Sequence, residues 1–252
     1  MRTRLLPSVF VFGAACRALD PSTTPIATDR PGLLFASSVV PRGVVQLELG
    51  APAAQLDRKR ADEFRLVQLA VQARYGWSET LELRVGGAPY GDLRNESAAG
   101  VSRERGAADL ELGVKYALAP TTSVLASARV PSGGALGSDD AAFSLFGIAE
   151  SALDERRSLK GLVGWTGGEV GAEWVDTATL GLLLNEVFHP RFSGYVSAVA
   201  YPVFGSDSTP AYAGVGLAYL LSSDVQLDCS ADVGLNDDAL DALVTAGISL
   251  RW

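Results

Sequence analysis

Apolar and polar residues alternate along most of the chain from residue 44 onward, with a period of two. In the first such stretch, Val45, Leu47 and Leu49 fall on one face. Gln46 and Glu48 fall on the other face. Successive side chains of a β-strand point to opposite sides, so the pattern predicts strands with one apolar and one polar face.

The same alternation recurs up to the last residue. It is clearest in four segments, residues 66–75, 81–86, 110–116 and 225–233. Residues 143–152 fit either phase, and residues 243–252 continue the pattern to Trp252. We count about twelve segments, most of them near the 9 to 11 residues that a tilted strand needs to cross a bilayer. A barrel can end on such a strand, because its last strand pairs with its first and leaves no open edge in lipid.

The predicted connections alternate between long and short. Tight turns are expected at residues 76–79, 119–122 and 154–157. Long loops are expected at residues 51–64, 88–108, 131–142 and 166–173. Short turns at one rim and long loops at the other are typical of outer-membrane barrels. We therefore expect an all-β fold, a transmembrane antiparallel up-and-down β-barrel of about twelve strands. A soluble secreted sandwich or barrel is the architectural alternative.

The polar face carries too many charges for a dry core but suits a water-filled lumen, so lipid is the better cover for the apolar face. The lumen-lining candidates are Glu82, Arg84, Glu111, Lys115, Arg129, Asp228, Asp232 and Arg251. These side chains could tune a polar passage, or pair across neighbouring strands and brace the wall. Aromatic residues near strand ends are expected in the interfacial girdles. The interface candidates are Tyr75, Trp77, Tyr116 and Trp252.

The first residues predict an export signal. Two arginines, Arg2 and Arg4, precede an apolar run and a small-residue region, so we place a signal peptide at residues 1–18, with cleavage near 15–18. Cys16 would then be removed with the signal peptide or, alternatively, lipidated. If Cys16 is removed, Cys229 has no cysteine to form a disulfide with. Residues 19–43 have no steady period and are expected to form an irregular segment, either periplasmic or plugging the lumen. The barrel would span residues 44–252.

Composition and residue types exclude several functions. Asp and Glu total 29 against 21 Lys and Arg, a formal net charge of -8, so nucleic acid is an unfavourable partner. His189 is the single histidine, and Ser193 would stand roughly 13 Å from it along an extended strand. That separation disfavours a Ser-His pair, so no catalytic residues are expected. No ligand spacing for a metal and no cofactor motif is found, and we expect a protein that is not an enzyme.

Several motifs resemble an outer-membrane barrel family of transporters named for the MetA pathway of phenol degradation. The matching pieces are TDRPG (28–32), GVVQLELG (43–50), ARYGWSETLELRVGG (73–87), GAADLELGVKYAL (106–118), VPSGG (130–134), VQLDCSADVGLNDD (225–238) and GISLRW (247–252). The resemblance covers nearly the whole mature chain. It implies an outer-membrane barrel that helps small apolar or aromatic compounds cross, and it brings no ligand-binding residues to carry over. Such barrels usually end in Phe, whereas this chain ends in Trp252.

The leading expectation is therefore an outer-membrane channel or uptake protein for small molecules, aromatic or apolar compounds among them. The alternative is a structural or adhesive barrel with a blocked lumen and ligand-binding outer loops. The expected partners are outer-membrane lipid, the barrel-assembly machinery and a small-molecule solute. The sequence leaves the oligomeric state open.

Overall fold

The computed structural model describes residues 24–59, 62–170 and 173–252. Within these ranges the chain forms β-strands and no α-helix, and none of it is helical over a length that could cross a membrane. The strands are β1 (Val45–Lys59), β2 (Asp62–Gly76), β3 (Leu81–Ser97), β4 (Gly100–Gly106), β5 (Leu110–Ala119), β6 (Thr122–Val130), β7 (Ala142–Ala152), β8 (Arg157–Val170), β9 (Glu173–His189), β10 (Phe192–Ala200), β11 (Ala211–Ser222), β12 (Val225–Gly234) and β13 (Ala242–Arg251).

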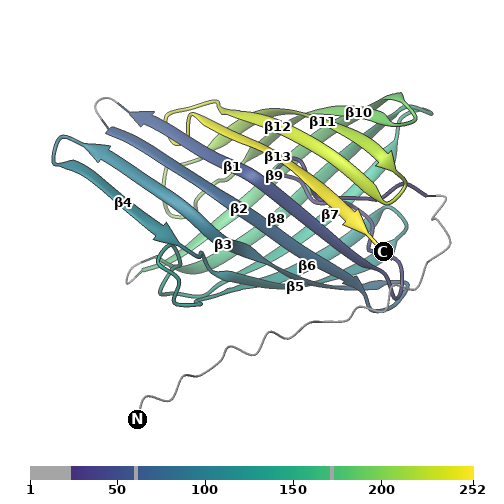
Figure 1. Cartoon of the computed structure of the whole chain (residues 1–252), viewed down its shortest axis with the longest axis horizontal. Helices are drawn as coiled ribbons and strands as arrows, with labels where there is room; N and C mark the ends of the chain where they lie inside the picture. Colours follow the sequence, from purple (N-terminus) through teal and green to yellow (C-terminus); the bar gives the residue numbers. More distant parts are fainter. Residues whose placement is uncertain (1–23, 60–61, 171–172) are drawn as a thin grey trace, which may run out of the picture.

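Twelve of these strands close into an antiparallel barrel, as the alternation predicts (Figure 1). Each pairs with its neighbours in sequence, except that β3 pairs with β5 and β4 pairs only with β3. The barrel closes where β1 pairs with β13, with Gln46 opposite Arg251. Val45 and Trp252 exchange backbone hydrogen bonds of 2.9 and 3.0 Å at this seam. The last strand therefore satisfies the edge of the first, which a barrel in lipid requires.

The tight turns, the start of β1 and the end of β13 lie at one rim. The other rim carries the longer β6/β7, β10/β11 and β12/β13 connections and the extended β1–β2, β3–β4 and β8–β9 hairpins. The short-turn rim holds the β2/β3, β5/β6, β7/β8, β9/β10 and β11/β12 turns. Three expected long loops are wrong in extent, because strands continue through residues 51–59, 88–97 and 166–170. The region at 88–108 is an extended β3–β4 hairpin rather than an open loop. Backbone pairing needs no apolar side chains, so strands can extend beyond the apolar part of the wall.

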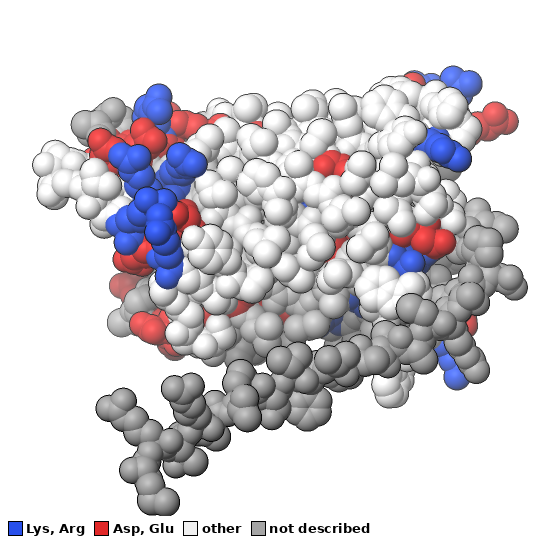
Figure 2. Space-filling view, in the orientation of Figure 1, with Lys and Arg blue, Asp and Glu red and all other residues white. Residues whose placement is uncertain are grey.

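Most of the wall has polar side chains inside and apolar side chains outside, the reverse of a soluble domain, and β6 to β10 also carry an inward-facing apolar cluster. Strand β12 shows this alternation over its whole length. Its buried, inward side chains are Gln226, Asp228, Ser230 and Asp232. Its exposed, outward side chains are Leu227, Cys229, Ala231 and Val233. Figure 2 shows the result, an outer surface with few charges in the middle and charges gathered at both ends. Cys229 is a free thiol on this outer wall.

Candidate functional site

Residues 24–44, which we call the plug, enter the lumen from the short-turn rim and return to it (Figure 1). Near their start, the backbone N–H of Ile26 donates to the carbonyl of Ser223 at 2.7 Å. Near their end, the backbone N–H of Gly43 donates to the carbonyl of Gly76 at 2.7 Å. Both partners lie at short turns of the wall. Between these anchors Ala36 is only 4% exposed, so the plug backbone runs inside the barrel.

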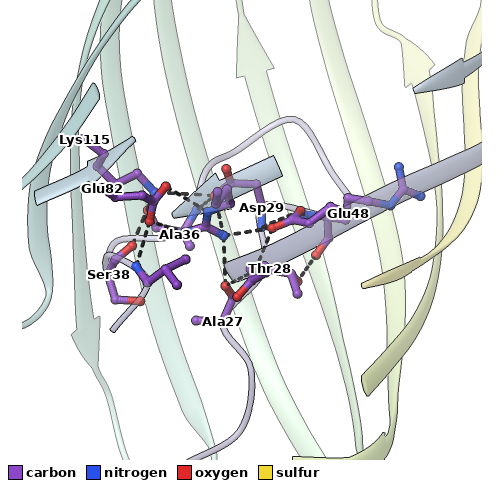
Figure 3. Close-up of polar contacts among 12 residues, drawn as sticks. Ala27, Thr28, Asp29, Ala36, Ser38, Glu48, Glu82 and Lys115 are labelled. Carbon is purple, nitrogen blue, oxygen red and sulfur yellow. Dashed lines mark hydrogen bonds and ion pairs between the residues drawn. The ribbon is translucent and has the colours of Figure 1, made fainter. Parts of the chain in front are cut away.

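Six charged side chains meet where the plug lies against the inner face of the wall formed by β1, β2, β3 and β5. This ionic cluster comprises Asp29, Glu48, Arg74, Glu82, Arg84 and Lys115. Arg74 is its centre, with Nη1 2.8 Å from Glu48 Oε1 and Nε 2.8 Å from Glu82 Oε1. Asp29, the single member from the plug, pairs with Arg84 and lies 3.6 Å from Lys115 Nζ (Figure 3). Three carboxylates thus face three cations, and the cluster is neutral overall.

The same wall side chains bind the plug backbone. Glu48 Oε2 accepts the backbone N–H groups of Asp29 and Arg30, both at 3.1 Å. Glu82 Oε2 accepts the N–H of Val40 at 2.7 Å, and Lys115 Nζ donates to the carbonyl of Ala36 at 2.9 Å (Figure 3). A buried backbone group without a partner is costly, so a segment with no secondary structure needs such side chains to be stable inside the barrel.

Other strands hold the opposite side of the plug. Arg30 Nη2 reaches Asp228 Oδ1 on β12 at 3.0 Å and Thr245 Oγ1 on β13 at 2.9 Å. The hydroxyl of Tyr195 on β10 donates to the carbonyl of Pro31 at 3.1 Å. The plug is therefore tied to strands on both sides of the lumen, which narrows the lumen in the half near the short turns.

An apolar cluster completes the packing of the plug. Leu34 of the plug is 3% exposed and packs among inward-facing side chains of the wall. These wall residues are Leu125, Phe146, Ile148, Leu162, Leu183 and Val199. The Phe35 ring meets the Phe146 ring edge-on, with centroids 5.1 Å apart. The plug thus has an ionic side and an apolar side, and each matches the wall that it contacts.

Among the described residues, the lumen contains a larger and a smaller cavity, each lined in part by the plug. The larger, about 520 Å³, lies toward the long-connection rim and is lined by Arg84, Glu111, Arg129 and Phe35 among others. Its roof is the β6/β7 connection, which folds inward because Asp109 accepts the backbone N–H of Ser138 at 2.7 Å. The smaller, about 280 Å³, surrounds residues 26–38 of the plug. A cavity of the larger size falls within the range of small-molecule sites.

Comparison with known proteins gives the family. Residues 28–252 match the family described as "Putative MetA-pathway of phenol degradation". The chain belongs to this family. The match begins at the TDRPG motif, which supplies Asp29 and Arg30 to the plug, so the family's extent includes most of the plug as well as the barrel. No curated protein matches the sequence.

Solved structures share the fold at low sequence identity. The translocator domain of the autotransporter NalP from Neisseria meningitidis has a TM-score of 0.63 at 10% identity, covering 89% of this chain and 90% of that one. The β-domain of the Bordetella autotransporter BrkA has a TM-score of 0.60 at 13% identity, covering 82% and 98%. The NanC porin has a TM-score of 0.53 at 8% identity, covering 82% and 98%. These likenesses show the barrel fold.

The eight residues predicted from the sequence to line the lumen lie in three places in the structure. Glu82, Arg84 and Lys115 are buried in the ionic cluster. Glu111 and Arg129 line the larger cavity, where Arg129 Nε lies 3.8 Å from Asp109. Asp228, Asp232 and Arg251 lie on the β12–β13 side. Of these, Asp228 binds the plug through Arg30, and Arg251 pairs with Asp224 at 2.6 Å and donates to the carbonyl of Thr24.

The aromatic candidates lie together at the short-turn rim. Tyr75 and Trp77 are exposed at the end of β2 and in the following turn, with ring centroids 6.4 Å apart. Tyr116 is exposed near the end of β5, and Trp252 follows β13. Their shared level on the outer wall is the arrangement expected of an interfacial girdle.

The lumen-lining residues predicted from the sequence did not include two sets of residues that the structure has at the site, one from the wall and one from the plug. Arg74 and Glu48 stand at the centre of the ionic cluster, and the alternation had already placed Glu48 and Arg74 on the polar faces of their strands. Asp29 and Arg30 come from a segment without periodicity, so no pattern indicated where they point. Within the described residues, no three His, Cys, Asp or Glu side chains are grouped to hold a metal ion.

His189 is predicted to be dispensable. It is exposed at the end of β9, where its Nδ1 accepts the backbone N–H of Arg191 at 3.3 Å. We expect His189→Ala to leave solute flux into proteoliposomes unchanged and to change the free energy of unfolding by less than about 0.5 kcal/mol. A tenfold loss of flux in a folded variant would contradict this expectation and would place function at the short-turn rim.

Proposed function

We propose that the protein is an outer-membrane channel for small molecules, in which solute passes through the lumen and the plug controls the passage. The observation that carries the proposal is a polar, charged lumen containing a cavity of about 520 Å³, enclosed by a wall with an apolar outer face. A water-filled polar interior inside an apolar belt is the arrangement of outer-membrane channels. Membership of the family and the shared fold of the NanC porin are consistent with this function.

The proposed orientation places the short-turn rim in the periplasm. Outer-membrane barrels have short periplasmic turns and longer outer connections. The plug enters from the short-turn rim, so under this orientation it enters from the periplasm. The larger cavity then faces the cell exterior, where a solute would arrive first.

We propose small aromatic or apolar molecules with a polar group as the solute class. The larger cavity combines the Phe35 ring with the charged groups of Arg84, Glu111 and Arg129, so it offers both an aromatic surface and polar partners. The guanidinium carbon of Arg84 lies 5.4 Å from the centre of the Phe35 ring. The family description, which refers to phenol degradation, agrees with this class.

A second candidate function follows from the plug itself. Because the plug is tied to the wall on both sides of the lumen, the barrel could be closed to solutes and could act through its outer connections. The β3–β4 hairpin would then be the main binding surface. The two candidates differ in one measurable property, the passage of solute through the folded barrel.

Solute entry into proteoliposomes tests the proposal. The full chain is reconstituted, its folding is checked by its shifted migration in unheated gels, and swelling is measured with phenol-sized aromatic solutes, monosaccharides and a large dextran. We expect entry of the small solutes and exclusion of the dextran. No entry of any small solute through folded protein would favour the closed, binding barrel. Recovery of the protein from cells without detergent would contradict the membrane location.

The lipid-facing wall makes a further prediction. Val163 lies midway along β8 with its side chain exposed on the outer wall. We expect Val163→Arg to reduce the free energy of unfolding from a bilayer by about 2–4 kcal/mol, since a charge at the bilayer midplane is poorly solvated. Leu153, exposed in the β7/β8 turn, is the matched control, and Leu153→Arg is expected to cost about 0–1 kcal/mol. Equal costs at the two positions would indicate that the wall does not face lipid.

A further inference from the structure

Arginines gather on the outer wall at the long-connection rim, over β2, β3 and β4 (Figure 2). In the strand register, Arg65 on β2 lies directly opposite Arg94 on β3, and Arg94 lies directly opposite Arg103 on β4. The three residues therefore form one row across three adjacent strands, which we call the arginine row. All three side chains are exposed. Directly opposed side chains on a sheet stand about 5 Å apart, and like charges at that distance destabilise the pairing.

Nearby carboxylates compensate this charge only in part. Asp92 accepts hydrogen bonds from Arg103 and Arg105, and Glu96 pairs with Arg94 at 2.7 Å. The hydrogen bonds from Arg103, together with those from Arg105, lower the pKa of Asp92 to about 2, so it is ionised at neutral pH. Arg58 is paired with Glu63 at 3.3 Å. Arg65 has no ion pair with any carboxylate in the part of the chain that the structure describes.

Among the described residues on this outward face, five arginines stand against three carboxylates, an excess of two positive charges. The chain as a whole has a formal net charge of -8, so this local excess runs against the overall composition. A local positive surplus on an acidic protein indicates an anionic partner at this position.

The row lies just beyond the apolar part of the wall. Along the outward face of β2, Leu69 lies opposite Tyr90, and Arg65 comes four residues before Leu69, nearer the long-connection rim. At about 3.3 Å per residue, the row is roughly 13 Å beyond that apolar pair. A shallow groove of about 540 Å³ joins the two levels. Pro52, Val67, Leu69 and Tyr90 line it with the arginines above them. The groove is therefore apolar at lipid depth and cationic at headgroup depth.

We propose that the arginine row and this groove bind a phosphorylated glycolipid of the outer leaflet, with its phosphates on the row and an acyl chain in the groove. The proposal rests on the proposed membrane location and orientation, which put this rim at the outer surface. Guanidinium groups bind phosphate oxygens bidentately, so three arginines side by side can hold more than one phosphate. Bound phosphate would also relieve the repulsion within the row.

Binding of purified lipid A to the full chain tests the proposal. The folded barrel in detergent micelles is titrated with bisphosphorylated lipid A, with its dephosphorylated form and with inorganic phosphate, and bound lipid is counted by native mass spectrometry. We expect bisphosphorylated lipid A to bind at least about tenfold more tightly than the dephosphorylated form, since charge-assisted hydrogen bonds are lost with the phosphates. Millimolar inorganic phosphate should not displace it, because phosphate lacks the acyl chain.

Three variants complete the test. The triple variant R65Q/R94Q/R103Q should bind bisphosphorylated lipid A at least about tenfold more weakly. The triple variant with lysines at these positions keeps the charge but loses the bidentate geometry, so its affinity should be intermediate. The control R156Q/R157Q/R191Q removes the same charge from exposed positions at the short-turn rim and should bind like the wild type.

Wild-type affinity in the glutamine variant would overturn the proposal, and so would displacement by inorganic phosphate, which would indicate a site for the free anion. If the glutamine variant does not fold, the lysine variant decides, because wild-type affinity there would exclude bidentate recognition. Solute flux is measured on the same preparations. Flux without lipid binding would contradict this proposal alone, whereas lipid binding without flux would contradict the channel function alone.

Discussion

Replacing Arg74 with methionine should release the plug from the wall and increase solute flux. Arg74 is fully buried, and its guanidinium binds Glu48, Glu82 and the carbonyl of Ala27. Without it, two carboxylates remain buried beside Asp29 with only Arg84 and Lys115 to balance them. Breaking a buried ion pair by removing one partner costs about 3–5 kcal/mol, and the cluster can relieve this cost by admitting water and letting the plug go.

The measurements are proteoliposome flux, the free energy of unfolding, and protease cleavage within residues 24–44 of the folded barrel. Arg191→Met is the control, since Arg191 is exposed in the β9/β10 turn, where a substitution should change stability by less than about 0.5 kcal/mol. We expect the Arg74 variant to show higher flux and cleavage within the plug. Wild-type flux and a protected plug in a folded Arg74→Met barrel would mean that the ionic cluster does not hold the plug.

Gly76→Val should displace the plug at its exit. Gly76 ends β2, and a β-carbon there would overlap the backbone carbonyls of Val40 and Pro41. Backbone atoms cannot turn away as a flexible side chain can, so the plug must shift or the strand end must move. Overpacking of this kind costs about 1–3 kcal/mol. It would also weaken the hydrogen bond between Gly43 and Gly76 that returns the chain to the wall.

The expected results are a lower free energy of unfolding, higher flux, and cleavage close to residue 41. Gly147→Val is the matched control, because a β-carbon at Gly147 makes only ordinary contacts with Val163 and its backbone. Gly147 faces outward on β7, so valine there should leave flux unchanged. Identical flux in the two valine variants would show that the plug does not depend on its contact with the end of β2.

The architecture followed from the sequence because a membrane barrel repeats one rule at every strand. Segment 225–233 alternates without a break, and the structure has its polar side chains inside and its apolar ones outside. The extent of the strands was harder to predict. Beyond the apolar belt both faces of a strand contact water. The β3–β4 hairpin therefore carries charged residues at consecutive positions, and apolar and polar residues no longer alternate along it. Backbone pairing holds that hairpin together, and pairing leaves little trace in composition.

Of the ionic cluster, only the residues on the barrel strands could be predicted from the sequence. Alternation assigned Glu82, Arg84 and Lys115 to the polar face, where the structure has them buried. Their partner Asp29 lies in a segment with no period, so its direction depends on contacts that form only in the closed barrel. The placement of residues 24–44 inside the lumen, one of two alternatives at the level of sequence, likewise depends on hydrogen bonds to several distant strands. The predicted signal peptide and Cys16 lie outside the described residues.

Single-channel recording in planar bilayers tests most directly whether the plug controls passage through the lumen. The full chain is compared with a variant lacking residues 27–41, which keeps every barrel strand. We predict low or intermittent conductance for the full chain and a larger, steady conductance for the deletion variant, because the segment that narrows the lumen is gone. Equal conductance in the two folded proteins would contradict the account.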